Sequence, residues 1–340
     1  MPLPIDFVLT WLDDNDPEWI EKRNSALEKV DKGTVDTRKM RTRDWCTLPY
    51  FFRGVAKYAP WVNHIYVVTP NQCPIWLNTD HPKITIVDQD TLFDDKSAIP
   101  TFNNCAIELL MHKIPGLSEQ FVYFNDDMLI LSDVSEKDFF RDGLPCITAA
   151  ISPILPYYDQ DGKGTYGIDV SNFSIVAKHF CKKDVMRNGW KKYFDPRNGK
   201  ELIRTLLCMP FKALPGFNEM HIAYSYLKKT FEEVWVTEPK ALSESCRKRF
   251  RSDFCLNHHT MRYWQMAKGE FSVRRRSLSR FFIISKNGDE TAPIRCIKSG
   301  RPKMICINDD IADVDAFEKI AKRVSGALEE RFPEKCEFER

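Results

Sequence analysis

The chain has 340 residues and carries 50 Lys and Arg against 48 Asp and Glu, so its formal net charge is +2. Hydrophobic residues make up 43% and charged residues 29%, which is typical of a soluble globular protein. This composition excludes a disordered chain, and the balanced charge argues against a general nucleic-acid binder.

Short apolar runs alternate with helical segments over the first 150 residues. Runs rich in β-branched and aromatic residues predict strands at 5–11, 64–69, 84–87 and 121–124. Apolar residues three or four apart predict helices at 49–58 and 106–113. This alternation indicates an α/β fold with a parallel or mixed sheet and helices on its faces. Ligands of such folds bind beyond the carboxyl ends of the strands, so the residues after each strand are the first site candidates.

The later part of the chain is richer in helix and in basic charge. Helices are predicted at 220–235 and 259–268, within a helical, basic region of about 175–285 that would cover a substrate. Residues 300–340 are expected to add a closing strand and a helix, because the apolar residues from Phe317 to Leu328 share one helical face.

Eleven cysteines bear on the cellular compartment. Their number is odd, no two have the C-x-x-C spacing of a zinc site, and most have apolar neighbours. This pattern is typical of reduced, buried thiols and predicts a reducing compartment. Residues 1–11 lack the features of a signal peptide, and no apolar stretch is long enough to span a bilayer. A soluble or peripheral protein is therefore expected.

Acidic residues follow the first predicted strand. Asp13, Asp14 and Asp16 lie within four residues, shortly after Trp11. Carboxylates at the end of a buried strand need solvent, a cation or ligand hydroxyls as partners. The alternative is a solvated turn in which Asp16 caps a helix that begins at Pro17.

The sequence Asn-Asp-Asp occurs twice, at 125–127 and at 308–310, and each copy follows an apolar run. A carboxylate pair at the end of a buried strand can bind a divalent cation that bridges diphosphate oxygens. A tight turn is the alternative for residues 125–127. If the two copies converge in space, they predict a metal-phosphate centre.

Basic residues supply the opposite charge. Arg43 precedes the first long helix, and the segment 246–280 is strongly basic, with three consecutive arginines at 274–276. The planar guanidinium group suits phosphate recognition, although a solvated face is the alternative for 274–276. Acidic strand ends combined with a basic later segment favour a phosphate-bearing substrate.

Histidine and glutamate residues are candidates for proton transfer. His221 is predicted at the start of a helix, where it could also lie beside a bound phosphate. Glu108 lies on the predicted helix before residues 125–127, with a surface position as the alternative. His258 and His259 offer a second site or a structural role. The chain has no Walker A loop, dinucleotide-binding glycine motif or nucleophile elbow, so P-loop and dinucleotide chemistry are excluded.

Four blocks of the chain together resemble the Stealth family of sugar-phosphate transferases, which includes bacterial capsular and exopolysaccharide enzymes. The first block is 5–19. The second and most specific one runs from Arg43-Asp44 through 48–69 to 123–127. The third runs from 218–221 through Phe250-Arg251 to 263–265, and the fourth is 306–310 with the following helix.

The resemblance implies a glycosyltransferase-A-like or Rossmann-like core sheet flanked by helices, with a helical subdomain in the second half. It further implies one catalytic unit over 1–340, with nucleotide-sugar binding in about 1–150. The activity implied is transfer of a sugar-1-phosphate, such as N-acetylhexosamine-1-phosphate, from a nucleotide sugar to a glycan hydroxyl. A phosphodiester forms and a nucleoside monophosphate leaves. The partners that the resemblance implies are the nucleotide-sugar donor and a capsule glycan acceptor, on the cytoplasmic side of a bacterial membrane. It further implies that the basic segment 246–280 contacts lipid or a growing anionic polymer.

The site residues fall into three groups, with Mg²⁺ or Mn²⁺ as the expected cofactor. The catalytic candidates are Glu108, Asp127, His221 and Arg251. The donor-binding candidates are Trp11, Asp13, Asp16, Arg43, Asp44 and Asn104. The metal-binding candidates are Asp126, Asp127, Asn308 and Asp309. Two other functions remain open at this point: a metal-dependent glycosyltransferase that releases nucleoside diphosphate, and a non-catalytic glycan-binding protein.

Overall fold

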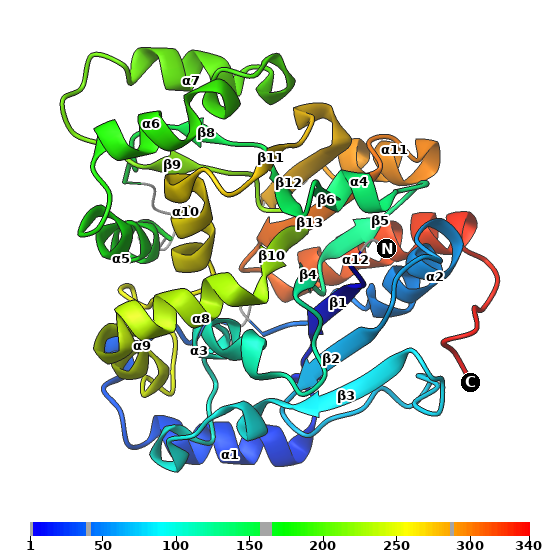
Figure 1. Cartoon of the computed structure of the whole chain (residues 1–340). Helices are drawn as coiled ribbons and strands as arrows, with labels where there is room; N and C mark the ends of the chain where they lie inside the picture. The colour runs from blue at the N-terminus through cyan, green and yellow to red at the C-terminus, as the bar shows by residue number, and fades with distance from the viewer. Residues whose placement is uncertain (1–2, 39–41, 157–164, 286–288) are drawn as a thin grey trace.

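The computed structural model of the chain describes residues 3–38, 42–156, 165–285 and 289–340. Helices and strands alternate in it, as expected for an α/β protein (Figure 1). The helices are α1 (Pro17–Leu27), α2 (Leu48–Tyr58), α3 (Asn104–Leu110), α4 (Glu136–Phe139), α5 (Tyr166–Ala177), α6 (Lys182–Tyr193), α7 (Glu201–Leu207), α8 (Lys228–Thr237), α9 (Pro239–Cys246), α10 (His259–Lys268), α11 (Thr291–Ser299) and α12 (Val314–Arg331).

The strands are β1 (Ile5–Thr10), β2 (Ile65–Thr69), β3 (Ile84–Asp88), β4 (Gln120–Asn125), β5 (Met128–Ile130), β6 (Phe140–Arg141), β7 (Leu144–Ile147), β8 (Ala150–Ile151), β9 (Phe217–Asn218), β10 (Tyr224–Leu227), β11 (Ser272–Val273), β12 (Ser279–Ser285) and β13 (Met304–Asp310). Short 3-10 turns include Gln89–Leu92, Met111–Lys113 and Pro196–Asn198.

The main sheet has the strand order β10-β4-β1-β2-β3 within the described residues. Strands β1 to β4 run parallel to one another, and β10 runs antiparallel to β4 at the edge. The inner strands β1, β2 and β4 are buried along almost their whole length, which explains their continuous apolar sequences. This arrangement places the ends of β1 and β4 side by side, with Thr10 opposite Asn125.

A second sheet brings distant parts of the chain together. Strand β13 pairs in parallel with β12 and antiparallel with β5, so residues after 300 lie beside the segment that follows β4. Helix α2 packs closely against β5, because a Cβ atom at Gly54 would lie 2.6 Å from the carbonyl oxygen of Ile130. Glycine at this position therefore sets the distance between α2 and β5.

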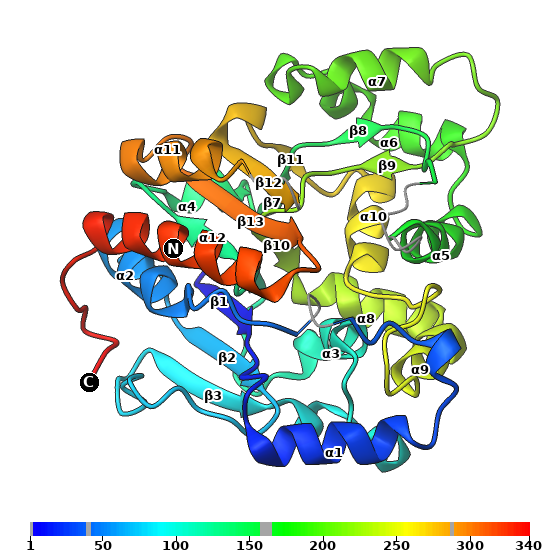
Figure 2. The same ribbon diagram turned by 180° about the vertical axis from the view of Figure 1, so that it is seen from behind.

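Helices cover the sheets unequally. Figures 1 and 2 show α2 and α12 together on one side of the main sheet, whereas α5, α6, α7 and α10 gather at the end of the molecule furthest from β3. One buried hydrophobic cluster includes residues from Ile5 to Phe338 and so joins the first and last parts of the chain. No described helix has the length and apolar character needed to cross a membrane.

Most predicted elements are confirmed, and one is wrong. The four predicted strands correspond to β1 to β4, and the predicted helices at 49–58, 106–113 and 259–268 correspond to α2, α3 with its following turn, and α10. The helix predicted at 220–235 is wrong in its first half, because Tyr224–Leu227 forms β10 and the helix begins only at Lys228. Pairing with β4 satisfies the backbone groups at that edge of the sheet, and the local apolar spacing did not reveal it.

All eleven cysteines are unpaired, and seven of them are buried. The prediction that most of the thiols are buried is confirmed for those seven. Cys46, Cys73 and Cys181 are exposed instead.

Candidate active site

A cleft lies at the carboxyl ends of β1 and β4. Its walls come from the ends of these two strands, the start of α3, the end of β13 and the loop that contains Arg251. Eight of the predicted site residues line it: Trp11, Arg43, Asn104, Asp126, Asp127, Arg251, Asn308 and Asp309. The position agrees with the general rule for parallel sheets.

The two Asn-Asp-Asp segments converge in this cleft, as hypothesised from the sequence. The amide of Ile307 donates to the carbonyl oxygen of Asp127 at 3.0 Å, in continuation of the pairing between β5 and β13. Both segments contribute to the lining of the cleft. The acidic residues are therefore held by strand pairing between segments far apart in the sequence.

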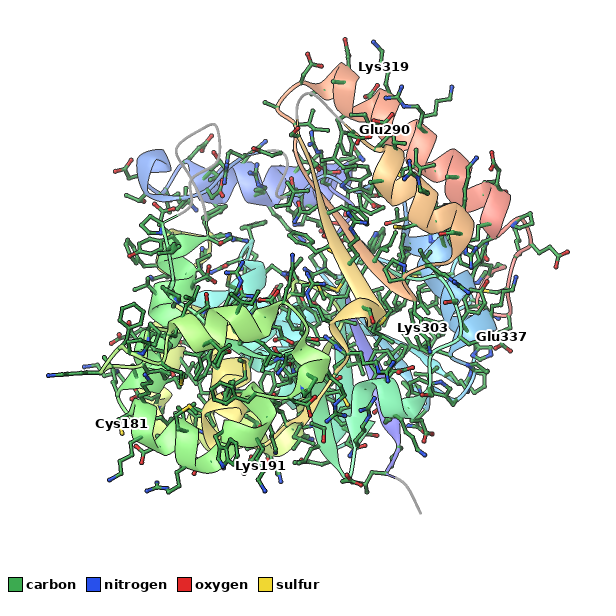
Figure 3. All side chains as sticks on the ribbon, turned by 90° about the horizontal axis from the view of Figure 1, so that it is seen from above. Cys181, Lys191, Glu290, Lys303, Lys319 and Glu337 are labelled. Carbon is green, nitrogen blue, oxygen red and sulfur yellow. The ribbon has the colours of Figure 1, made fainter. Side chains whose placement is uncertain are left out.

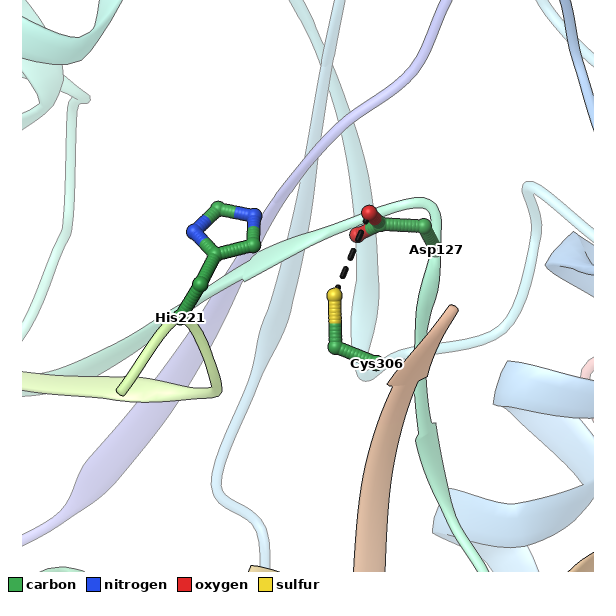
Figure 4. Close-up of side chains that lie close together, drawn as sticks. All are labelled: Asp127, His221 and Cys306. Carbon is green, nitrogen blue, oxygen red and sulfur yellow. Dashed lines mark hydrogen bonds between the residues drawn. The ribbon is translucent and has the colours of Figure 1, made fainter. Parts of the chain in front are cut away.

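Asp127 lies against a histidine and a cysteine (Figure 4). One possible ligand atom from each of Asp127, His221 and Cys306 lies within 4.8 Å of the others. The Cys306 thiol donates to Asp127 Oδ2 at 3.2 Å, while Asp127 Oδ1 is buried without a hydrogen-bond partner among the described residues. Burial raises the pKa of the Asp127 carboxyl and raises that of the Cys306 thiol well above its usual range.

Asp126 adds a second carboxylate next to Asp127. Burial, together with the nearby charges of Asp127 and Asp44, raises the pKa of Asp126 well above its usual range. This crowding of carboxylates is the situation that a divalent cation relieves. Oxygen donors for a cation are thus present at the position predicted from the sequence.

Asp309 has a different partner from the one predicted. It forms an ion pair with Arg43, and both side chains are almost fully buried, with exposed fractions of 2% and 7%. The Arg43 guanidinium also donates to the carbonyl oxygen of Ile311 at 2.8 Å and stacks on the ring of Phe317 at 3.7 Å. Burial lowers the pKa of Arg43 to about 10, so it stays charged at neutral pH. The charge of Asp309 is therefore balanced by Arg43. Through the contact of Arg43 with Phe317, the pair also connects the end of β13 to α12.

Glu108 is buried, so its alternative surface position is excluded, and it does not itself line the cleft. Its Oε1 accepts hydrogen bonds from Asn104 Nδ2 at 2.7 Å and from the Tyr123 hydroxyl at 3.1 Å. Its Oε2 lies 3.7 Å from His258 Nε2 and has no hydrogen-bond partner among the described residues. Burial raises the pKa of Glu108 to about 7, so this carboxyl can gain or lose a proton near neutral pH.

His221 lies in the turn between β9 and β10, not at the start of a helix as predicted. A phosphate site at a helix N-terminus is therefore absent at this residue. The ring is 2.8 Å from the Tyr224 hydroxyl through Nδ1 and 3.3 Å from Asn125 Nδ2 through Nε2. With the Asn125 amide donating to Nε2, the neutral ring carries its proton on Nδ1. Burial lowers the pKa of His221, which favours this neutral form.

Arg251 is a cation without an acidic partner at the cleft. Its loop is anchored by the amide of Asp36, which donates to the carbonyl oxygen of Arg251 at 2.9 Å. Within the ranges that the structure covers, its guanidinium forms no ion pair or hydrogen bond. The rings of Phe102 and Phe250 stack beside it at the cleft wall, 5.2 Å apart. An arginine held in this way is available to a phosphate group.

Two conserved regions of a known family match this chain. The region described as "Stealth protein CR2, conserved region 2" covers residues 41–146, and "Stealth protein CR1, conserved region 1" covers residues 3–31. The capsular polysaccharide phosphotransferase WcwK of Streptococcus pneumoniae is 36% identical over 338 residues, spanning 98% of this chain and 99% of that protein. The chain belongs to the Stealth family.

Other relatives of this Stealth protein have similar names. The receptor polysaccharide phosphotransferase WefC of Streptococcus oralis is 35% identical, covering 98% of this chain and 99% of the relative. The exopolysaccharide phosphotransferase cps2G of Lactiplantibacillus plantarum is 34% identical, covering 100% and 97%. Among solved structures, the galactosyltransferase LgtC has a TM-score of 0.38 at 10% identity, covering 93% of this chain and 95% of that one. That TM-score is low, and the fold described above rests on the strand order of the Stealth chain itself.

The two matched Stealth regions contain part of the site. Region 1 includes Trp11, and region 2 includes Glu108, Asp126 and Asp127. Four predicted site residues lie outside both matched regions: His221, Arg251, Asn308 and Asp309.

The donor-binding candidates of the Stealth chain divide into two groups. Trp11 lines the cleft, and its Nε1 donates to Asp44 Oδ2 at 3.2 Å, so Asp44 orients the indole ring from behind. Asp13 and Asp16 do not line the cleft. Asp16 caps α1 by accepting from the amide of Glu18 at 3.0 Å, and Gln72 Nε2 donates to its other oxygen at 2.9 Å. The capping alternative for Asp16 is therefore confirmed.

Replacing Asp16 tests this structural role. Asp16→Ala is expected to lower the free energy of unfolding by about 1 kcal/mol, whereas Asp16→Asn, which can still cap the helix, is expected to have little effect. Denaturant unfolding of both variants measures the difference. An increase in the KM for nucleotide sugar in both variants, with unchanged stability, would instead assign Asp16 to donor binding.

The sequence places Tyr123 and Cys306 within the Stealth-like blocks but gives neither a role, and in the structure they contact Glu108 and Asp127. Each lies two residues before the asparagine of an Asn-Asp-Asp segment, so the alternation of side chains along a strand was a usable signal for both. His258, considered as a second site or a structural residue, lies beside Glu108.

Proposed function

We propose that this Stealth protein transfers a sugar-1-phosphate from a nucleotide sugar to a glycan hydroxyl in capsule or exopolysaccharide synthesis. The donor proposed is a UDP-N-acetylhexosamine-like nucleotide sugar, and the products are a phosphodiester and a nucleoside monophosphate. The observation that carries the proposal is one cleft that brings the carboxylates of Asp126 and Asp127 together with Arg251, which forms no ion pair among the described residues. Glu108 lies behind this cleft, hydrogen-bonded to the lining residue Asn104, and its pKa is raised to about 7. The names of the full-length relatives, which are polysaccharide phosphotransferases, support the reaction class.

Asp126 and Asp127 would hold a divalent cation, Mg²⁺ or Mn²⁺. The buried, unpartnered Oδ1 of Asp127 and the carboxylate crowding at Asp126 fit such an ion. Asn308 is a further candidate ligand from the cleft wall, whereas the pairing of Asp309 with Arg43 removes Asp309 from the proposed set. A bound cation would neutralise the diphosphate oxygens of the donor.

Glu108 and His221 are the candidates for the general base. The acceptor hydroxyl gives its proton to one of them while its oxygen forms a bond to the phosphorus next to the sugar. The phosphoanhydride bond of the donor breaks, and the nucleoside monophosphate leaves with the electron pair. Arg251 stabilises the negative charge on the phosphoryl oxygens during this exchange. The eleven unpaired cysteines support a cytoplasmic location for the reaction.

The nucleotide by-product tests the proposal. Purified protein is incubated with Mg²⁺ or Mn²⁺, a panel of nucleotide sugars and glycan acceptors, and the released nucleotide is identified by chromatography. Nucleoside monophosphate is the expected product. Nucleoside diphosphate would show an ordinary glycosyltransferase, and no release with any donor would favour a glycan-binding protein. An Asp127→Asn preparation run in parallel excludes contaminating enzymes.

A further inference from the structure

Helix α7 exposes apolar side chains to solvent. Ile203, Leu206 and Leu207 are 60%, 57% and 70% exposed and share one side of the helix at spacings of three and four residues. Phe211, in the turn that follows, is 52% exposed. The opposite side of the helix, with Glu201 and Thr205, is buried. We call Ile203, Leu206, Leu207 and Phe211 the apolar face of α7.

The chain around the apolar face of α7 is strongly basic. Residues 178–212 contain ten Lys and Arg but only three Asp and Glu, a net charge of +7 in a protein whose total is +2. The rest of the chain is therefore net negative. Positive charge is concentrated on the part of the protein that also exposes apolar side chains.

A groove at the amino-terminal end of α7 adds further cations. Its basic lining residues are Arg197, Lys200, Arg275, Arg276, Arg280 and Arg301, and no carboxylate from the described residues lines it. Arg197 and Arg276 pair with Asp195 and Glu201 behind the groove. The other four have no acidic partner in the part of the chain that the structure covers.

This surface is separate from the candidate active site. The groove contains residues at the start of β12 and just before β13, whereas Asn308 and Asp309 line the active-site cleft at the far end of β13. Helix α7 lies at the outer end of the molecule in Figures 1 and 2. Figure 3 looks down on this end and shows Lys191 of the neighbouring α6 at the edge of the helical layer.

We propose that the apolar face of α7 and the adjoining basic groove form a docking surface for a membrane that contains anionic phospholipid. The apolar side chains would enter the headgroup region, and the groove would bind lipid phosphates. A second copy of the chain is a poor occupant, because two surfaces of net positive charge repel each other. A soluble polyanion would match the charge but would leave the apolar face uncovered.

The docking surface is connected to the candidate active site through short elements. Arg204 of α7 donates to Ser152 beyond β8 at 3.5 Å, and β8 pairs with β9, three residues before His221. The proposal goes beyond the reaction proposed above, and its test does not use that reaction.

Vesicle co-sedimentation of the full-length protein tests the docking surface. Vesicles of phosphatidylcholine alone are compared with vesicles in which roughly one-third of the lipid is phosphatidylglycerol. The wild-type protein is expected to bind the anionic vesicles and not the neutral ones. The double variant Leu206→Glu/Leu207→Glu is expected to bind anionic vesicles at least about tenfold more weakly than wild type. The same reduction is expected for the double variant Lys200→Glu/Arg280→Glu. Ile75→Glu, at an apolar residue exposed elsewhere (94%), is the matched control and is expected to bind like wild type.

Three outcomes would overturn the proposal. The first is a wild-type protein that does not bind anionic vesicles. The second is loss of binding in the charge variant alone, with the Leu206/Leu207 variant unchanged, which would indicate a polyanion site. The third is a wild-type dimer that the Leu206/Leu207 variant converts to a monomer in light scattering, which would assign the face to self-association. Circular dichroism of every variant establishes that it is folded.

Discussion

Asp127→Asn is expected to lower the rate of transfer about 1,000-fold, a loss of about 4 kcal/mol in transition-state stabilisation. Asparagine keeps the shape of the side chain but removes the charge that lies between His221, Cys306 and the cleft. The fold is expected to survive, because burial already raises the pKa of this carboxyl and one of its oxygens has no hydrogen-bond partner among the described residues. Steady-state kinetics with thermal unfolding measure both effects.

Asp133→Asn is the matched control for this variant. Asp133 lies shortly after β5 and is exposed, so the same change of charge there is expected to leave the rate unaltered. Binding of Mn²⁺, followed by electron paramagnetic resonance, is expected to weaken in the Asp127 variant only. A normal rate and normal Mn²⁺ binding in Asp127→Asn would remove Asp127 from both the reaction and the metal site.

Glu108→Gln is expected to lower the rate of transfer about 100- to 1,000-fold, because glutamine cannot accept a proton from the acceptor hydroxyl. In the wild-type protein the raised pKa of about 7 predicts that activity falls as the pH decreases below that value. The variant is expected to lose this acidic limb of the pH profile. Glu232→Gln, at an exposed residue of α8, is the control. An acidic limb that persists in Glu108→Gln would assign the base to His221.

The same substitution is expected to stabilise the protein at alkaline pH. The pKa of Glu108 is raised on folding, so between pH 4.5 and about 7 the folded protein binds more protons than the unfolded chain. The free energy of unfolding therefore decreases as pH rises through this window, by about 3 kcal/mol in total. Glutamine has no such titration, so Glu108→Gln is expected to unfold at a higher denaturant concentration than wild type at pH 8. A lower midpoint would show that the carboxylate stabilises the fold.

The sequence allowed the parallel core of the fold to be predicted because local patterns determine it. Strands β1, β2 and β4 are buried on both faces, and their continuous apolar runs identify them without tertiary information. Strand β10 was missed because its pairing with β4 depends on a partner about a hundred residues earlier in the chain. Strand β12 was also missed, although its residues are alternately buried, because it lies within the region that was predicted to be helical.

For the site, residue types were easier to predict than partners. The convergence of residues 125–127 with 308–310 followed from their similarity, and the structure brings them together. The pairing of Arg43 with Asp309 could not be foreseen, because opposite charges in one cleft leave many pairings open and packing against Phe317 selects this one. The burial of Glu108 depends on Tyr123 and His258, which only the folded sheet brings to it.

The pairing of β5 with β13 has a consequence for the protein during its synthesis. Strand β5 leaves the ribosome about 170 residues before β13, which corresponds to a delay of roughly 10 to 35 s at ordinary translation rates. During that time the apolar edge of Met128–Ile130 lacks its native partner, and the nascent chain cannot assemble the cleft. Chaperone binding and premature aggregation are therefore expected to concentrate on this edge until β13 has been synthesised.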